Sequence, residues 1–171
     1  MEQEWRFIWI ASGGDLPKIK ELIARGVNPV AVNNQALVFA ASNGHLEVVQ
    51  YLVTLPGVDP SAQDNQAIIM AASRGFLEVV QYLVTLPVVD PAARNNKSIE
   101  MAADKEKWDI VRFLASLQGL DPRENNNELF IWLVSENMAV ATKGLVKSKK
   151  LMPLFMTILL LSPPPDMAIT I

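Results

Sequence analysis

A repeat with a period of 31 residues constrains the fold of this chain more than any other feature of its sequence. Residues 65–95 match residues 34–64 at most positions, and Gly75 falls on Gly44. The pattern continues, with more differences, from Asn96 onwards. A fixed period of this length is typical of a solenoid, in which each repeat packs only on its neighbours. We therefore expect a row of similar structural units.

Each copy of the repeat predicts two helices joined by a tight turn. Ile68, Ala71 and Ala72 recur at the spacing of one helix face, and the two small alanines let another helix come close. Gly75 is expected in the turn, because a backbone with positive φ favours glycine. The second helix has an apolar stripe of its own, formed by Leu77, Val80, Leu83 and Val84.

The segment between two units is rich in proline, aspartate and asparagine. Pro87 is expected to end the second helix, because proline has no N–H for the helical hydrogen bonds. Asp90 and Pro91 predict a turn, and Asp64 and Asn95 are expected to cap the first helix of the next unit. A calcium-binding loop is a second interpretation of such residues, but the ligand spacing of an EF-hand is absent.

Two runs in neighbouring copies, A-A-S-N-G-H-L-E-V-V-Q-Y-L (residues 40–52) and A-A-S-R-G-F-L-E-V-V-Q-Y-L (residues 71–83), resemble the ankyrin repeat. That family's pattern has two alanines, a glycine, often a histidine, and then a helix of leucine and valine. The resemblance covers about residues 4–126, although the period is shorter than the family's 33 and the T-P-L-H opening is absent. It implies an all-α fold, an ankyrin-type helix-turn-helix solenoid of about four repeats followed by a degenerate C-terminal cap.

The pattern divides the chain of 171 residues into three parts. An ankyrin-like repeat domain is expected over residues 1–126, followed by a degenerate capping repeat over residues 127–150. Residues 151–171 form an apolar tail that contains a run of prolines. Within the first part, the repeats are expected at about residues 4–33, 34–64, 65–95 and 96–126.

Two features of the first repeats have a structural and a functional interpretation. Trp5, Phe7 and Trp9 are large where the inner copies carry smaller residues. They form either an aromatic binding patch or a cap that closes the open end of the stack. His45 is the only histidine, and it stands where the ankyrin pattern often has one, which predicts a role in stabilising the turn.

The C-terminal segment has three interpretations. A short basic run from Lys143 to Lys150 precedes an apolar stretch from Leu151 to Leu161. This stretch is far shorter than the roughly 20 residues that a membrane-spanning helix needs. It is a last helix packed on the final repeat, an anchor at a membrane surface assisted by the lysines, or the remnant of a longer protein.

Composition excludes several kinds of site. The chain has no cysteine, so disulfides and thiolate chemistry are excluded, and a lone histidine does not make a zinc site. The sequence shows no catalytic constellation and no glycine-rich phosphate loop. Its net charge of −3 implies no general attraction to nucleic acid. We therefore expect a protein that is not an enzyme and uses no cofactor or metal. The lack of a secretory leader pattern favours a cytoplasmic location.

The resemblance implies a non-enzymatic module that binds another protein or a peptide. In the ankyrin family, partners bind the finger loops and the inner face of the first helices. A membrane-tethered adaptor that uses the lysine-rich and apolar C-terminal segment is the alternative function. Ten residues lie at positions that match the family's binding surface or lie next to it, and some of these positions vary between copies. They are Asn34, Gln35, Asn43, Asn65, Gln66, Arg74, Asn96, Lys97, Glu100 and Lys105.

Arg74 and Lys105 occupy one position in adjacent copies, and Asn43 occupies it in the copy before. In an ankyrin-like stack, these three residues are expected to lie in a row at the exposed end of the first helices. Two cations in one row favour an acidic or phosphate-bearing partner. The alternative is that they are ordinary solubilising residues, which the helix dipole favours at the C-terminal end of a helix.

Overall fold

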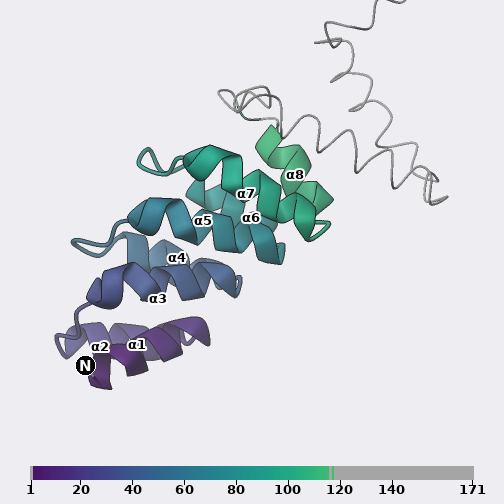
Figure 1. Ribbon diagram of the computed structural model, residues 1–171. Coiled ribbons are helices and arrows are strands. Elements are labelled where there is room, and N and C mark those ends of the chain that lie inside the picture. Colours follow the sequence, from purple (N-terminus) through teal and green to yellow (C-terminus); the bar gives the residue numbers. More distant parts are fainter. Residues whose placement is uncertain (1, 116, 118–171) are drawn as a thin grey trace, which may run out of the picture. The chain divides into compact units, whose positions relative to one another are not determined.

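The computed structural model describes residues 2–115 and 117, apart from the side chains of Asn95 and Ala115. This part of the chain contains eight α-helices and no strand (Figure 1), which confirms the all-α helix-turn-helix solenoid expected from the sequence. The expected capping repeat and tail, residues 127–171, lie outside the described residues. The helices are α1 (Glu2–Ser12), α2 (Leu16–Ala24), α3 (Ala31–Ser42), α4 (Leu46–Val53), α5 (Ala62–Arg74), α6 (Leu77–Leu83), α7 (Ala93–Asp104) and α8 (Trp108–Ala115).

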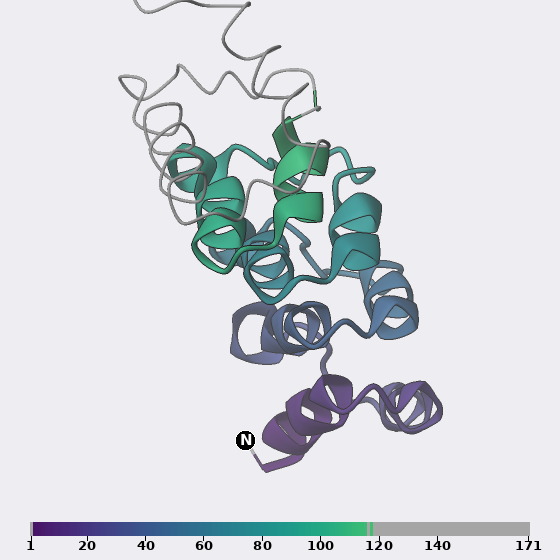
Figure 2. The same cartoon turned by 90° about the vertical axis from the view of Figure 1, so that its right-hand side faces the viewer.

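The helices form two layers. Figure 2 looks along them and shows α1, α3, α5 and α7, which we call the first helices, in one column and α2, α4, α6 and α8 in the other. The first helices pack on one another along the stack, whereas the second helices approach one another at few points. The row of first helices therefore provides most of the contact between repeats.

Residues that stay the same between copies fill the space between the layers. Ala41, Ala72 and Ala103 occupy one position on successive first helices, and all three are buried. Their small side chains let the helices approach closely, as the sequence predicts. The second helices contribute two more buried sets, Val49, Val80 and Val111, and Leu52, Leu83 and Leu114.

The turn between the two helices of a unit needs glycine for two reasons. Gly44 has a φ of 78°, in the left-handed region that favours glycine. A Cβ atom at Gly44 would also collide with the ring of Phe76, and one at Gly14 would collide with the ring of His45. Each of these turns is therefore covered by the residue directly before the second helix of the next repeat. In the fourth unit, Glu106 takes the glycine position and keeps a φ of 57°.

His45 joins two neighbouring turns. Its ring lies over Gly14, and its Nε2 atom donates to the carbonyl oxygen of Ser12 at 2.9 Å. The Nδ2 atom of Asn43 donates to the same carbonyl at 2.8 Å. The side chain therefore stabilises a turn, as expected, and that turn belongs to the preceding repeat.

A left-handed turn lies within the first residues of each inner first helix. Residues 32–34 and residues 63–65 all have φ between 52° and 63°, and Arg94 and Asn96 follow the same pattern at 55° and 60°. Such values cost free energy in residues other than glycine, least in asparagine and aspartate. The expectation that Asp64 caps α5 is wrong, because Asp64 lies inside this turn and no side chain caps the start of the helix.

The loops that lead into these turns follow the chemistry expected of aspartate and asparagine before proline. Asp59 Oδ1 accepts a hydrogen bond from the N–H of Ser61 at 2.9 Å, and Asp90 Oδ1 accepts one from the N–H of Ala92 at 2.9 Å. Asn28 makes the equivalent bond in the first unit. Each side chain therefore closes a tight turn on its own backbone.

Candidate functional site

The solvent side of the first helices presents residues at a spacing of four. Residues four apart lie one turn apart on the same side of a helix. These are Gln35 and Phe39 on α3 and Asn43 directly after it, and the same three positions recur on the other first helices or directly after them. All are at least partly exposed. We call this set the first-helix face: Trp5, Trp9, Gly13, Gln35, Phe39, Asn43, Gln66, Met70, Arg74, Lys97, Met101 and Lys105.

Most of the contact residues predicted from the sequence lie on this face or beside it. Glu100 lies beside it and forms an ion pair with Lys97, in which Oε1 and Nζ are 2.8 Å apart. The predicted residues on the face itself are Gln35, Asn43, Gln66, Arg74, Lys97 and Lys105.

Arg74 links two first helices. Its Nη1 atom donates to Asn43 Oδ1 at 2.7 Å and to the carbonyl oxygen of Ser42 at 3.3 Å. Both acceptors are neutral and belong to the end of α3. Among the described residues, no carboxylate forms an ion pair with Arg74 or Lys105. The cation of Arg74 is therefore held in place without being neutralised.

Asn34 and Asn65, which the sequence analysis places among the contact residues, serve the fold instead. Each residue is only 7% exposed. Asn34 Oδ1 accepts from the N–H of Asp59 at 3.1 Å, and Asn65 Oδ1 accepts from the N–H of Asp90 at 2.8 Å. These bonds tie each left-handed turn to the loop that follows the same helix pair. Because a buried amide already bonded within the fold has little to offer a partner, we leave both residues out of the candidate surface.

Asn96 occupies the same position in the fourth unit and is 3% exposed, so we leave it out as well. Within the described part of the chain, its Oδ1 atom has no hydrogen-bond partner. One period after Asp90 comes Asp121, which lies outside the described residues.

Side chains of the left-handed turns also join neighbouring repeats. Gln63 Nε2 donates to the carbonyl oxygen of Asn33 at 2.7 Å, and its Oε1 accepts from Gln35 Nε2 at 3.3 Å. One repeat later, Arg94 Nη1 donates to Gln66 Oε1 at 3.0 Å. Gln35 and Gln66 are thus positioned by the next repeat while they remain partly exposed. Gln63 and Arg94 were not among the predicted site residues. They occupy one position of the repeat, and the sequence shows that this position differs between copies.

Apolar side chains are the other part of the face that the predicted contact residues did not include. Trp9 is 79% exposed, Trp5 is 54% exposed and Phe39 is 38% exposed. Phe7, on the same helix as the tryptophans, is fully buried. The N-terminal aromatic residues therefore divide between the core and the surface. The signal in the sequence is that Trp9, Phe39, Met70 and Met101 share one position of the repeat and are apolar in every copy.

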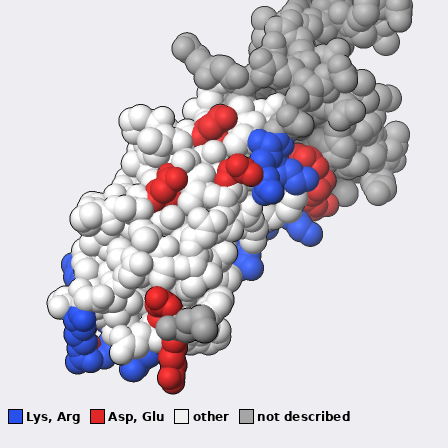
Figure 3. Space-filling model, turned by 60° about the vertical axis from the view of Figure 1, so that its left-hand side comes forward, with Lys and Arg blue, Asp and Glu red and all other residues white. Residues whose placement is uncertain are grey.

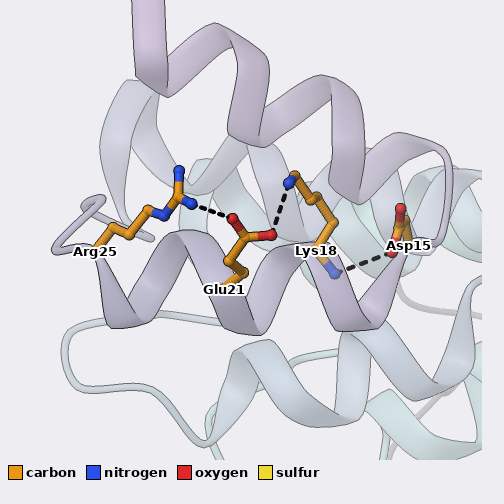
Figure 4. Close-up of polar contacts among 4 residues, drawn as sticks. All are labelled: Asp15, Lys18, Glu21 and Arg25. Carbon is orange, nitrogen blue, oxygen red and sulfur yellow. Dashed lines mark hydrogen bonds and ion pairs between the residues drawn. The ribbon is translucent and has the colours of Figure 1, made fainter.

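Charges are unevenly distributed over the stack. Figure 3, turned toward the side of the connecting loops, shows a surface that is mostly free of charged residues. A separate charged cluster lies on α2, where Glu21 contacts Lys18 at 2.6 Å and Arg25 at 2.5 Å (Figure 4). The hydrogen bond from Lys18, together with the charge of Arg25, lowers the pKa of the Glu21 carboxyl. This cluster belongs to the layer of second helices.

Two further features bear on the functions weighed from the sequence. No group of three acidic or histidine side chains suited to a metal ion occurs in the described part of the chain. Within the same residues, no helix has the length and apolar character needed to cross a membrane. The lysine-rich and apolar segment, residues 143–161, lies outside this part, so the membrane-tethered alternative stays a prediction.

Comparison with known protein families agrees with the repeat pattern. A model of ankyrin repeats in three copies matches residues 37–126, which is more than half of the chain. A second model, of ankyrin repeats in many copies, matches residues 7–53. No curated protein matches the chain.

Proposed function

The chain belongs to the ankyrin repeat family, whose members are generally protein–protein interaction modules, and we propose that its partner binds the first-helix face. The partner is another protein or a peptide. The left-handed turns, at the positions that match the family's finger loops, extend this surface through Gln35 and Gln66, which directly follow two of them.

One observation carries this proposal. Near the C-terminal end of the first helices, an alanine position that stays the same between copies is buried, whereas a position that differs between copies reaches the surface. Ala41 and Ala72 are fully buried, but Asn43 and Arg74, two residues further along in each copy, reach the surface. Stacking requires every repeat to present the same packing surface, and the exposed side is free to diverge. Divergence on one continuous face is what a binding surface needs.

The histidine and serine side chains that could act in catalysis form hydrogen bonds within the fold, which supports a non-enzymatic role. His45 Nε2 is bonded to the carbonyl of Ser12. Ser42 Oγ donates to the carbonyl of Phe39 at 3.1 Å. A catalytic serine needs a neighbouring base that accepts its proton, and neither residue offers that arrangement.

The proposal is tested by capture of partners with the full chain as bait, followed by mass spectrometry. The face variant carries Arg74→Gln and Lys105→Gln. The control carries Gln50→Glu and Gln81→Glu, two exposed positions one period apart on the second helices. Both variants lower the net charge equally. We expect the face variant to bind a captured partner more weakly by at least about 1 kcal/mol, and the control to bind normally. Equal binding by both variants would place the interaction elsewhere.

The membrane-tethered adaptor is tested separately. Flotation of liposomes with the full chain is compared with flotation of a chain that ends at Lys150. Lipid binding that disappears with residues 151–171 would favour the adaptor, and equal behaviour of both chains would dismiss it. A cytoplasmic location remains our proposal, consistent with the cysteine-free composition, and imaging of a fluorescent fusion tests it.

A further inference from the structure

The composition of the first-helix face changes steadily along the stack. On α1 the three positions hold Trp5, Trp9 and Gly13, with no charge. On α7 they hold two lysines, Lys97 and Lys105, on either side of a methionine. The helices between them are intermediate, with Gln35, Phe39 and Asn43 on α3 and Gln66, Met70 and Arg74 on α5. One end of the face is therefore aromatic and the other cationic.

The aromatic end presents three exposed aromatic side chains on two adjacent helices. Trp5 and Trp9 lie one turn apart on α1, and Phe39 takes the position of Trp9 on the adjacent helix α3. Trp9 keeps 79% of its surface in contact with water. Exposed apolar patches of this kind mark binding sites, and tryptophan contributes strongly to binding where a partner covers it.

Arg74 and Lys105 are the cations of this end that form no ion pair among the described residues. Arg74 is bonded to neutral acceptors on α3, and Lys97 is already paired with Glu100. None of the twelve positions of the face is acidic. Asp104 and Glu106 flank Lys105 in the sequence and weaken the field there, so Arg74 is the stronger of the two open cations.

A single line of apolar side chains connects the two ends. Trp9, Phe39, Met70 and Met101 stand one per helix across the four first helices. Such a line suits one strand of polypeptide that crosses the helices. Packed helices lie about 8–10 Å apart and an extended chain advances about 3.3 Å per residue, so α5 and α7 lie about five to nine residues from α1 along that strand.

We propose that the first-helix face binds an extended segment of another protein that is apolar at one end and acidic at the other. Its bulky apolar side chain packs on Trp5 and Trp9, and its carboxylates, about five to nine residues away, meet Arg74 and Lys105. The inference rests on the proposed function, and it adds the composition and the direction of the partner. Uncharged chain lies along the uncharged half of the face and negative charge along the positive half.

The test selects displayed random peptides of about 12 residues, long enough to span the four helices, on the full chain. We expect the retained peptides to carry an apolar residue and an acidic pair at the stated separation. In fluorescence anisotropy, Trp9→Gln is expected to weaken their binding at least about tenfold. Val88→Gln is the matched control, because Val88 is 57% exposed but lies in the loop after α6. It is expected to leave binding within about twofold. Circular dichroism checks that each variant is folded.

Direction is tested by double-mutant cycles. The apolar residue of a selected peptide is expected to couple to Trp9, and its acidic residues are expected to couple to Arg74, with no coupling in the crossed pairs. Peptides that lack the pattern, or that bind the Trp9→Gln variant unchanged, would overturn the inference while leaving an interaction module in place. Failure to retain any peptide, together with no partner captured by the full chain, would count against the proposed function itself.

Discussion

The two ends of a first helix reach positive φ by different means. After the helix, a single glycine does so, as at Gly44 with a φ of 78° and Gly75 with a φ of 95°. At the start of each inner first helix, consecutive residues with side chains do so, over residues 32–34 and 63–65. Glycine adopts this backbone conformation without steric cost, whereas the residues of the left-handed turn adopt it against a steric penalty from their side chains.

The difference follows from what each turn contacts. The ring of Phe76 covers Gly44 and leaves no room for a Cβ atom. In the left-handed turn, Asn65 accepts a hydrogen bond from the loop after its helix pair, and Gln63 donates one to the turn of the preceding repeat. Glycine is used where space is short. Side chains are used where their hydrogen bonds between segments offset the backbone strain.

The largest effect is expected at the glycine turn. Gly44→Ala should destabilise the chain by about 2–5 kcal/mol, because the left-handed conformation costs about 1–2 kcal/mol and the collision with Phe76 adds about 1–3 kcal/mol. Urea unfolding followed by circular dichroism measures the loss. Gly26→Ala is the control, since Gly26 has a φ of 84° with nothing within 4 Å of a Cβ atom. Equal losses in both variants would show that space at Gly44 is not limiting.

The next largest effect is expected at the buried asparagine of the left-handed turn. Asn65→Ala should cost about 1–3 kcal/mol, because the N–H of Asp90 loses its acceptor in a partly buried setting. Asn65→Gly separates the two roles of the residue, since glycine relieves the positive φ but also lacks the acceptor. The glycine variant should therefore lose less stability than the alanine variant in the same urea titration. If glycine restored full stability, the hydrogen bond would contribute no more than the backbone strain that glycine relieves.

The glycine turn was predictable from the sequence and the left-handed turn was not. Gly75 follows an apolar helical stripe, and glycine after a helix has one common structural use. Asparagine and aspartate before a helix favour both a cap and left-handed backbone, and local sequence does not choose between them. The prediction for Asp64 failed for this reason. The choice depends on Asp90, 25 residues after Asn65, which supplies the N–H that the turn binds.

The candidate surface was predictable in part. Arg74 and Lys105 were found because a position that changes between copies is under little demand from stacking. Asn34 and Asn65 stay the same between copies, which itself indicated a structural role, but the resemblance to the family placed them on the finger loops. The apolar row that begins at Trp9 was not recognised from the sequence. The glycine turn of the first repeat, at Gly14, lies 30 residues before the next one, at Gly44, so Trp9 falls outside the period of 31.

A gain of stability is expected from a substitution in the fourth unit, where a residue with a side chain occupies the glycine position. Glu106 occupies the glycine position of the fourth unit with a φ of 57°. Glu106→Gly should stabilise the chain by about 1 kcal/mol, because it removes the steric cost of a side chain in the left-handed region. Glu106→Ala keeps the Cβ atom and should change stability little. A gain from alanine equal to that from glycine would assign the effect to the lost charge instead.

The smallest effect is expected at Val32, the first residue of the left-handed turn at the start of α3. Valine is the worst suited of the turn residues to its φ of 52°, because its branched Cβ crowds the backbone there, and the side chain is 42% exposed. Val32→Asn should therefore stabilise the chain by about 0.5 kcal/mol in urea unfolding, since asparagine tolerates this conformation best after glycine. Val32→Ala removes the branch but retains a Cβ atom, so the stability of this variant should fall between that of the unchanged chain and that of Val32→Asn. A loss of stability with asparagine would mean that the partial burial of Val32 outweighs its strain, and that the left-handed turns depend on packing as well as on hydrogen bonds.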